Sequence, residues 1–189
     1  MAIETEVKAR CNNFTAIKKW LKKLGARFIG KKHQIDTYYL VLPKKSRYHK
    51  VPLLRVRENK NKGKYFLEYH EPVNMYQAKE YEIEIDDPKV AKSVLEKLNY
   101  PLGAVVDKIR ESYIYDGLNI DLDQVTGLGK FIEVECMKNQ KDSLKRIYNF
   151  FERLQISKND LIPQERYVDM VWDIERKNKK LAKITSRKK

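Results

Sequence analysis

The sequence predicts an α+β protein: a closed eight-stranded antiparallel β-tunnel with a charged interior and helices packed outside. Three observations support this fold class. Short segments that alternate charged and apolar residues recur along most of the chain. The helical segments are too few to alternate with the strands one by one, which disfavours a parallel βαβ layout. The order of strands and helix in the first half also returns in the second, which indicates a pseudo-symmetric barrel.

The first half of the chain predicts one helix among five strand segments. Asn12 or Asn13 caps this helix, which runs to about Leu24 and is ended by Gly25. The polar residues 43–50 predict a loop. The predicted strand segments are 2–10, 27–31, 34–42, 52–59 and 65–71.

The second half predicts further strands and three helices. Asp86, Asp87 and Pro88 start a helix that ends near Leu98, because proline suits the first helical turn. Two more helices are predicted at about 140–155 and 165–173. The predicted strands are 77–85, 103–115, 118–124 and 130–136. In total the pattern indicates about eight strands and four helices.

Within each of these strands the charged residues lie on one face. Seven segments show this pattern: Glu4/Glu6/Lys8, Arg55/Arg57, Glu68/His70, Glu80/Glu82/Glu84, Lys108/Arg110, Asp121/Asp123 and Glu133/Glu135. A solvated outer face explains one such strand, but the opposite faces of several strands are apolar, as at Val7, Val56 and Ile120. Because the helices must pack on those apolar faces, closure into a barrel turns the charged faces inward.

The inward charges sort by sign. Carboxylates that cluster inside a barrel repel one another and lose hydration, so they require cations. Oxygen ligands suit hard divalent ions, here Mg²⁺ or Mn²⁺. The basic residues in turn require an anion, and Arg55 and Arg57 can each bind phosphate oxygens bidentately. A complex of polyphosphate and metal satisfies both sets of charges.

At these residues the chain resembles the CYTH family, also called the triphosphate tunnel metalloenzymes, which includes class IV adenylyl cyclases and thiamine, inorganic and RNA triphosphatases. The motif Glu-x-Glu-x-Lys that opens the family is present as Glu4-Thr5-Glu6-Val7-Lys8. The likeness spans nearly all of residues 1–172. The further segments that carry it are 34–38, 54–57, 79–84, 108–110, 123–129, 131–135 and 166–170.

The resemblance implies a role for each charged group. The implied metal ligands, for Mg²⁺ or Mn²⁺, are Glu4, Glu6, Asp121, Asp123, Glu133 and Glu135, with Asp123 as an alternative to Asp121 on the same face. The implied triphosphate-binding residues are Lys8, Arg55, Arg57, His70, Lys79, Lys108 and Arg110. The implied catalytic residues are Glu4, Glu6, Lys8, Glu82 and Glu84, the last two inside the tunnel as outer metal contacts or water-positioning groups.

Two positions depart from the family pattern. The family has a lysine in the context Tyr-Lys-x-Pro, where this chain has Tyr69-His70-Glu71-Pro72. His70 replaces that cation only when it is protonated, and otherwise offers a neutral hydrogen bond. Lys79 stands where the family often has arginine. Both departures bear on triphosphate affinity and on the pH optimum.

The predicted function is metal-dependent hydrolysis of inorganic tripolyphosphate or a related triphosphate, because the many cations favour a substrate that is mostly phosphate. The alternative is a class IV adenylyl cyclase that converts ATP to cyclic AMP and pyrophosphate, which needs an adenine pocket that the sequence does not identify. Thiamine triphosphatase and a non-catalytic binder of polyphosphate or RNA are further alternatives. Interior acids disfavour the binder, because they repel the anion it would hold.

The pattern divides the chain into a tunnel domain, residues 1–173, and a basic C-terminal tail, residues 174–189. The last 14 residues contain eight lysines and arginines and no acid, and so contribute +8 of the net charge of +14. We expect a frayed terminus, with contact to nucleic acid as the less favoured alternative. No apolar run approaches the ~18 residues of a membrane span. A cytoplasmic protein without a membrane partner is expected, and a homodimer stays open.

Overall fold

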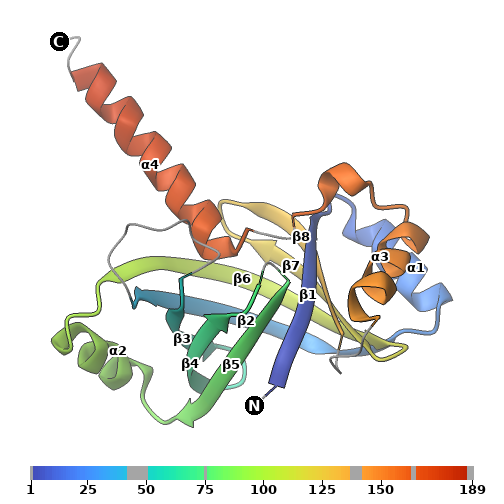
Figure 1. Cartoon of the computed structure of the whole chain (residues 1–189), viewed down its shortest axis with the longest axis horizontal. Helices are drawn as coiled ribbons and strands as arrows, with labels where there is room; N and C mark the ends of the chain where they lie inside the picture. Colours follow the sequence, from blue (N-terminus) through green and yellow to red (C-terminus); the bar gives the residue numbers. More distant parts are fainter. Residues whose placement is uncertain (1, 42–50, 75, 137–141, 163–164, 187–189) are drawn as a thin grey trace.

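Eight antiparallel strands of the computed structural model form a closed barrel among the residues that the structure describes, as the sequence predicted (Figure 1). Those residues are 2–41, 51–74, 76–136, 142–162 and 165–186. The order round the barrel is β1-β5-β4-β3-β2-β6-β7-β8, so the first strand closes the barrel between β5 and β8. The loop predicted at 43–50 lies outside the described residues.

The element bounds agree with most of the predicted ones. The strands are β1 Ala2–Arg10, β2 Arg27–Leu40, β3 Leu53–Asn59, β4 Lys64–Pro72, β5 Gln77–Ile85, β6 Leu102–Tyr115, β7 Leu118–Val125 and β8 Gly129–Cys136. The helices are α1 Phe14–Lys23, α2 Pro88–Lys97, α3 Ser143–Arg153 and α4 Tyr167–Ser186, with a 3-10 turn at Lys158–Asp160. The side chains of Asn13 and Asp87 cap α1 and α2.

Two predicted elements differ from the structure. The strand segments at 27–31 and 34–42 are one strand, β2, which stays paired with β6 through a register shift between Phe28 and Gly30. Gly30 has a φ of 155° at this bulge, a backbone conformation that favours glycine. The short helix predicted at 165–173 continues to Ser186 as α4, so the basic tail is helical that far rather than frayed. No glycine or proline interrupts the sequence after Tyr167.

Helices α1 and α3 cover the apolar outer face of β1, β7 and β8. Buried residues of the strands, such as Ile120 and Ile132, pack in one cluster with Leu21 of α1 and Ile147 of α3. All four side chains are fully buried. The apolar strand faces are therefore used by the helices, and the charged faces are left inside the barrel.

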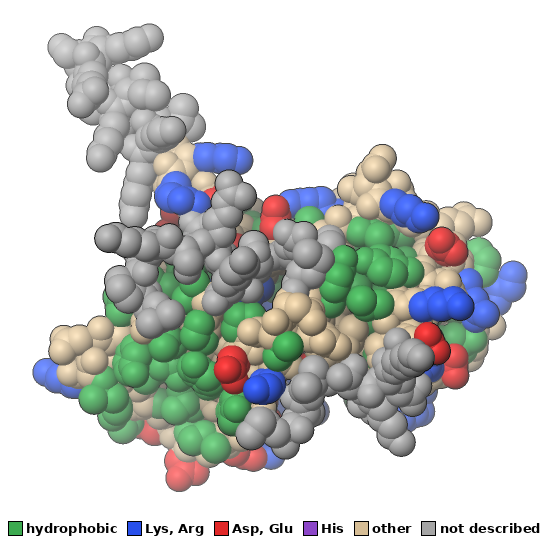
Figure 2. All heavy atoms as spheres, viewed as in Figure 1, with side chains coloured by type: hydrophobic (Ala, Val, Ile, Leu, Met, Phe, Trp, Pro, Cys, Tyr) green, Lys and Arg blue, Asp and Glu red, His purple; other side chains and the backbone are tan. Residues whose placement is uncertain are grey.

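Helix α2 covers a smaller part of the barrel, over β3 and β4. Leu95 packs with Tyr39 of β2 and Val56 of β3. The other apolar residues of this helix are turned outward, since Val90 is 58% exposed and Val94 is 49% exposed. Figure 2 shows apolar side chains at the surface over α2 and the neighbouring strands.

The first turn of α4 packs inside the barrel. Tyr167 and Val168 form a buried cluster with Tyr38, Val106 and Phe131. The last three face inward, because each lies two residues from a buried charged residue of its own strand. Beyond Trp172, which still contacts Gly103 of β6, α4 projects away from the barrel (Figure 1). Within the described residues, no helix combines the length and the apolar character needed to cross a membrane.

We predict that Ile147→Ala lowers the free energy of unfolding by about 2–5 kcal/mol, because it removes a fully buried side chain between α3 and the barrel. Urea titration followed by circular dichroism measures the change. The control Val94→Ala, on the exposed face of α2, should cost less than about 0.5 kcal/mol. A loss at Ile147 as small as that of the control would show that α3 does not pack on the barrel.

Candidate active site

Charged side chains from neighbouring strands meet inside the barrel because of the strand register. Residues on one strand face lie opposite residues on the same face of the next strand. The cross-strand pairs that result on one wall of the barrel are Glu6–Glu135, Lys8–Glu133, Glu133–Asp121 and Asp123–Arg110. The register thus brings together the acids and bases that the sequence predicted on β1, β6, β7 and β8.

Arg110 on β6 pairs with three carboxylates. Its Nη1 lies 2.7 Å from Oδ2 of Asp121, and its Nε donates to Oδ1 of Asp123 at 2.7 Å. Its Nη2 also pairs with Glu133. Burial alone would raise the pKa of Glu133, but Lys8 and Arg110 outweigh burial and hold that pKa well below its usual range. Glu133 is therefore ionised and compensated by cations of the protein itself.

The two buried lysines of the site pair with separate acids. Nζ of Lys8 lies 2.8 Å from Oε1 of Glu133, and Nζ of Lys108 lies 3.3 Å from Oδ2 of Asp123. Burial would lower the pKa of Lys8, but Glu133 and Glu6 together outweigh it and the pKa is raised. For Lys108 burial prevails, and its pKa is lowered. The charge of Lys8 is thus secured by the carboxylates around it.

The two arginines of β3 are held by acids of the adjacent strands. Arg57 forms a bidentate pair with Asp36 of β2, with Nε and Nη2 at 2.8 and 2.9 Å from its oxygens. Arg55 pairs with Glu68 of β4 and donates to the hydroxyl of Tyr38 at 3.2 Å. Nε of Arg55 is buried without an acceptor among the described residues. A phosphate oxygen would supply that acceptor, which favours an anion site here.

Asp36 and Glu68 belong to this site, although no role was predicted for either residue. Both side chains are buried, with exposures of 0% and 1%. Burial would raise the pKa of Asp36, but Arg57 and Arg55 outweigh it and hold the pKa far below its usual range. Glu68 was visible in the alternation with His70. Its partner was not, because the pairing of β3 with β4 brings Glu68 opposite Arg55.

A second group of acids is compensated only in part, with an ion pair between Lys8 Nζ and Glu6 Oε1 at 3.5 Å. Burial, together with Glu80 and Glu135, raises the pKa of Glu4 to about 8. Burial and the neighbouring Glu133 raise the pKa of Glu6 to about 7. Burial also raises the pKa of Glu135, which accepts a hydrogen bond from Asn119 at 3.2 Å. The pKa values of these carboxylates are raised by enclosure in the barrel and by the charges of one another.

The three acids with raised pKa values fit a divalent cation. Glu4, Glu6 and Glu135 offer the carboxylate oxygens that Mg²⁺ and Mn²⁺ prefer, and a bound cation would remove the repulsion that raises their pKa values. Asp123 and Glu133, in contrast, each pair with both a lysine and an arginine. In the described part of the chain, no three His, Cys, Asp or Glu side chains are gathered tightly enough to hold a metal. Binding therefore requires these acids to draw together.

Glu82 and Glu84 are not enclosed in the tunnel, which corrects the prediction for their positions. Both are exposed, and Glu84 pairs with Lys64 at 3.1 Å. The reason is the extent of β1, whose pairing with β5 reaches only to Glu80. The remainder of β5 lies beyond that ladder, and its charged residues meet solvent.

Lys79 also lies outside the cluster of predicted phosphate-binding residues. It is opposite Ile3 of β1, on the strand face that alternates with that of Glu80. Its side chain is 37% exposed, and Nζ lies 3.9 Å from Oε2 of Glu71. Lys79 is therefore part of the outer surface of the barrel.

His70 lies on the same strand face as Glu68, opposite Leu53 and Glu80. Burial lowers the pKa of His70 to about 4, although Glu80 acts in the opposite direction. The imidazole is therefore neutral near pH 7. Its Nδ1 is buried without a hydrogen-bond partner among the described residues. His70 thus offers a neutral hydrogen bond in place of the cation of the family lysine.

A cavity opens beside Glu4 and Glu6. Its lining includes Glu4, Glu6, His70, Tyr76, Glu80 and Arg166. Carboxylates, an imidazole and a guanidinium therefore border one entrance to the charged interior.

A closed eight-stranded antiparallel barrel whose interior carries paired acids and bases defines the class of triphosphate tunnel proteins. The CYTH domain model matches residues 2–164, and this chain belongs to the CYTH family.

Relatives of this chain carry two activity names. A curated protein of Methanocaldococcus jannaschii, "Putative adenylate cyclase MJ0240", is 31% identical over 175 residues, which cover 89% of this chain and 98% of the relative. The PH1012 protein of Pyrococcus horikoshii OT3 has 30% identity and a TM-score of 0.79, over 88% of this chain and 98% of that one. A Hippeastrum "putative adenylyl cyclase" is described as having a dominant triphosphatase activity. At 19% identity, TM-score 0.59 and coverage of 88% and 100%, it shows the fold alone.

We predict that Arg110→Gln lowers the free energy of unfolding by roughly 3–5 kcal/mol at pH 7, because the change leaves buried carboxylates without their shared cation. The loss should shrink at low pH. The folded pKa of Glu133 lies below its unfolded value of 4.5, so its stabilising contribution is present above pH 4.5 and is lost as the pH falls. Urea titrations at pH 7 and pH 4 measure both values. An equal loss at the two pH values would contradict the electrostatic account, and the exposed control Lys64→Gln should change little.

We predict that Mg²⁺ or Mn²⁺ raises the melting temperature more at pH 8.5 than at pH 6. The raised pKa values of Glu4 and Glu6 mean that their protonated forms stabilise the fold below pH 4.5, and that this contribution disappears as the pH rises through about 7 and 8. A metal binds the ionised carboxylates and so restores stability where they are ionised. Thermal unfolding with and without metal measures the difference. The double variant Glu4→Gln/Glu6→Gln should abolish it and Glu152→Gln should not; a pH-independent metal effect would exclude these ligands.

Proposed function

We propose that this CYTH protein is a divalent-metal-dependent hydrolase that cleaves inorganic tripolyphosphate or a related triphosphate in its tunnel. The observation that carries this proposal is a set of five enclosed basic side chains on three strands: Lys8, Arg55, Arg57, Lys108 and Arg110. None of these side chains is more than 14% exposed. So many enclosed cations complement a substrate whose surface is mostly phosphate.

The residues of the chain divide the work of hydrolysis between them. Arg55 and Arg57 bind phosphate oxygens and stabilise the charge that develops on the leaving phosphate. Lys8 exchanges its carboxylate partner, Glu133, for an oxygen of the substrate. Glu4 and Glu6 hold Mg²⁺ or Mn²⁺, which when bound neutralises phosphate charge and acidifies the attacking water.

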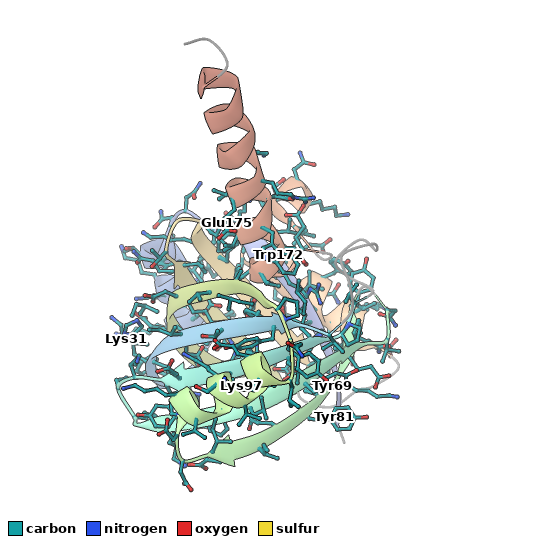
Figure 3. The ribbon with its side chains drawn as sticks, turned by 90° about the vertical axis from the view of Figure 1, so that its left-hand side faces the viewer. Lys31, Tyr69, Tyr81, Lys97, Trp172 and Glu175 are labelled. Atoms are coloured by element: carbon teal, nitrogen blue, oxygen red, sulfur yellow. The ribbon has the colours of Figure 1, made fainter. Side chains whose placement is uncertain are left out.

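A class IV adenylyl cyclase is the second candidate, because the 31% identical relative is named "Putative adenylate cyclase". In that reaction the ribose 3′-hydroxyl of ATP attacks the α-phosphorus and pyrophosphate leaves. The reaction needs a surface that holds adenine. Tyr69 packs against Tyr81 with ring centroids 5.9 Å apart, away from the charged interior (Figure 3), and Tyr39 is in the core. Tyr76 lines the cavity entrance and is the aromatic ring best placed to stack on a base.

Two further activities have less support. Thiamine triphosphate hydrolysis would gain from a tryptophan in the tunnel, but Trp172 donates its Nε1–H to the backbone oxygen of Gly103 at the base of α4 (Figure 3). A non-catalytic binder of polyphosphate or RNA gains nothing from Glu4, Glu6 and Glu135, because these carboxylates would repel the anion as well as one another.

We predict that the protein releases phosphate and pyrophosphate from tripolyphosphate with Mg²⁺ or Mn²⁺, and forms no cyclic AMP from ATP. A panel of tripolyphosphate, ATP and thiamine triphosphate, with phosphate and cyclic AMP measured together, tests this. Glu4→Gln and Glu135→Gln should abolish metal-dependent turnover, because they remove carboxylate ligands. Arg57→Ala should raise KM, because it removes a phosphate-binding cation.

The outcomes of this panel separate the candidates. Cyclic AMP and pyrophosphate from ATP would move the assignment to the cyclase. Binding of tripolyphosphate without turnover under either metal would favour the binder. Full turnover by Glu4→Gln would show that the metal ligands are assigned to the wrong acids. Glu152→Gln, on the exposed face of α3, is the matched control for loss of a carboxylate.

A further inference from the structure

Tyr167 is an aromatic side chain placed among the charges of the tunnel. It is the first residue of α4 and is only 4% exposed. The metal-dependent hydrolysis proposed above gives it no role. Packing of the helix explains why the residue is apolar, but not why its ring lies beside two ammonium groups.

The ring of Tyr167 contacts both buried lysines of the site. Nζ of Lys8, from β1, lies 4.3 Å from the ring centroid. Nζ of Lys108, from β6, lies 5.1 Å from the same centroid. Both distances are within the range of a cation–π interaction, which is stronger when the cation is desolvated. One side chain therefore touches cations that come from distant parts of the sequence.

The ring is held in place from several sides. Its hydroxyl donates to Oδ2 of Asp123 at 3.1 Å, and Phe131 packs edge-on with ring centroids 5.1 Å apart. The start of α4 is fixed by Arg166, whose Nε and Nη2 donate to Asp169 at 2.9 and 3.1 Å. One turn further on, Trp172 donates to the oxygen of Gly103 at 2.6 Å.

Gly103 is needed for this seating of the helix. A Cβ atom at position 103 would lie 2.8 Å from the ring of Trp172 and 3.2 Å from the backbone oxygen of Tyr38. The close approach of α4 to β6 therefore depends on the missing side chain. Because the helix is seated so tightly, the position of the Tyr167 ring is set by the fold and not by the lysines.

An aromatic ring holds a cation in a way that a carboxylate does not. A carboxylate neutralises the ammonium group and competes directly with phosphate for it, as Glu133 does for Lys8. A ring attracts the ammonium through its quadrupole, accepts no proton and leaves the full positive charge in place.

We propose that Tyr167 is a positioning residue for the phosphate-binding lysines. Its ring fixes the ammonium groups of Lys8 and Lys108 where a triphosphate meets them, while leaving their charge available to phosphate oxygens. This role rests on the proposed function for its substrate, but the lysine–ring contacts are tested separately below. By the same contacts, α4 is part of the wall that holds the substrate.

The test uses ring variants that keep the shape of the side chain. In the full-length protein, Tyr167→Phe loses the hydroxyl but keeps the ring, and trifluorophenylalanine at 167 keeps the shape but weakens the π face. We expect a KM for tripolyphosphate within about twofold of the parent for phenylalanine, about tenfold higher for the fluorinated ring, and kcat changed less than KM. Tyr167→Met, which fills similar volume without a ring, should match the fluorinated variant.

Trp172→Leu is the control for the second turn of α4, because it removes the contact with Gly103 while the Tyr167–Asp123 hydrogen bond and the Arg166–Asp169 pair still hold the ring. It should leave KM within about twofold of the parent. An increase in KM equal to that of the fluorinated variant would overturn the proposal, since seating of the helix would then explain both. A KM that is unchanged by fluorination would overturn it as well.

A second measurement does not depend on turnover. The ε-protons of a lysine held near an aromatic ring are shifted by its ring current, so NMR of lysine-labelled protein should show two shifted signals, lost in Tyr167→Met and kept in Tyr167→Phe. Calorimetry with tripolyphosphate in the absence of metal should show binding weakened about tenfold by the fluorinated ring. Ring-shifted lysine signals and weakened binding, in a protein that shows no hydrolysis, would support the positioning role of Tyr167 and contradict the proposed hydrolase activity. Unshifted lysine signals in the parent protein would contradict the positioning role of Tyr167.

Discussion

The pairing of Arg110 with Asp121, Asp123 and Glu133 fixes the interior of the barrel. Without that cation the three carboxylates, of which Asp123 and Glu133 are buried, would repel one another and lose their shared partner. Because the acids lie on β7 and β8 and the cation on β6, the same contacts hold the register of three strands. That register turns the alternate residues outward, where α1 and α3 cover them. The outer hydrophobic core and the inner ion pairs are therefore two consequences of one alignment.

The same pairing separates two kinds of acid in one tunnel. Asp123 and Glu133 are compensated by lysine and arginine, whereas Glu4, Glu6 and Glu135 are raised in pKa by enclosure and by one another. A metal–triphosphate complex brings positive charge to the second group and negative charge to the cations of the first. The metal in such a complex meets the acids, and the phosphates meet the lysines and arginines. The site is thus complementary to a charge-paired ligand rather than to a bare anion.

Local patterns predicted the barrel, because a period of two is visible within each strand and assigns charged residues to one face. Properties that depend on distant neighbours could not be predicted in this way. The exposure of Glu82 and Glu84 follows from where β1 stops along β5, and the partners of Asp36 and Glu68 follow from strand register. The break predicted in β2 fell at Lys32 and His33, and only the pairing of the whole strand with β6 shows that it is continuous. The basic residues after 173 resembled a tail because α4 continues there without a core to pack on.

Closure of the barrel by β1 also has a consequence for the order of assembly. Ala2–Arg10 pairs with β5 through its first residues and with β8 through the rest, and β8 ends at Cys136. During synthesis, Glu4 and Glu6 leave the ribosome before almost every other part of the tunnel. They acquire Glu135 as a neighbour only after some 130 further residues have been added. The acids of β1 therefore cannot meet Glu135 until β8 has been synthesised. The group of carboxylates suited to a metal draws on both ends of the tunnel sequence.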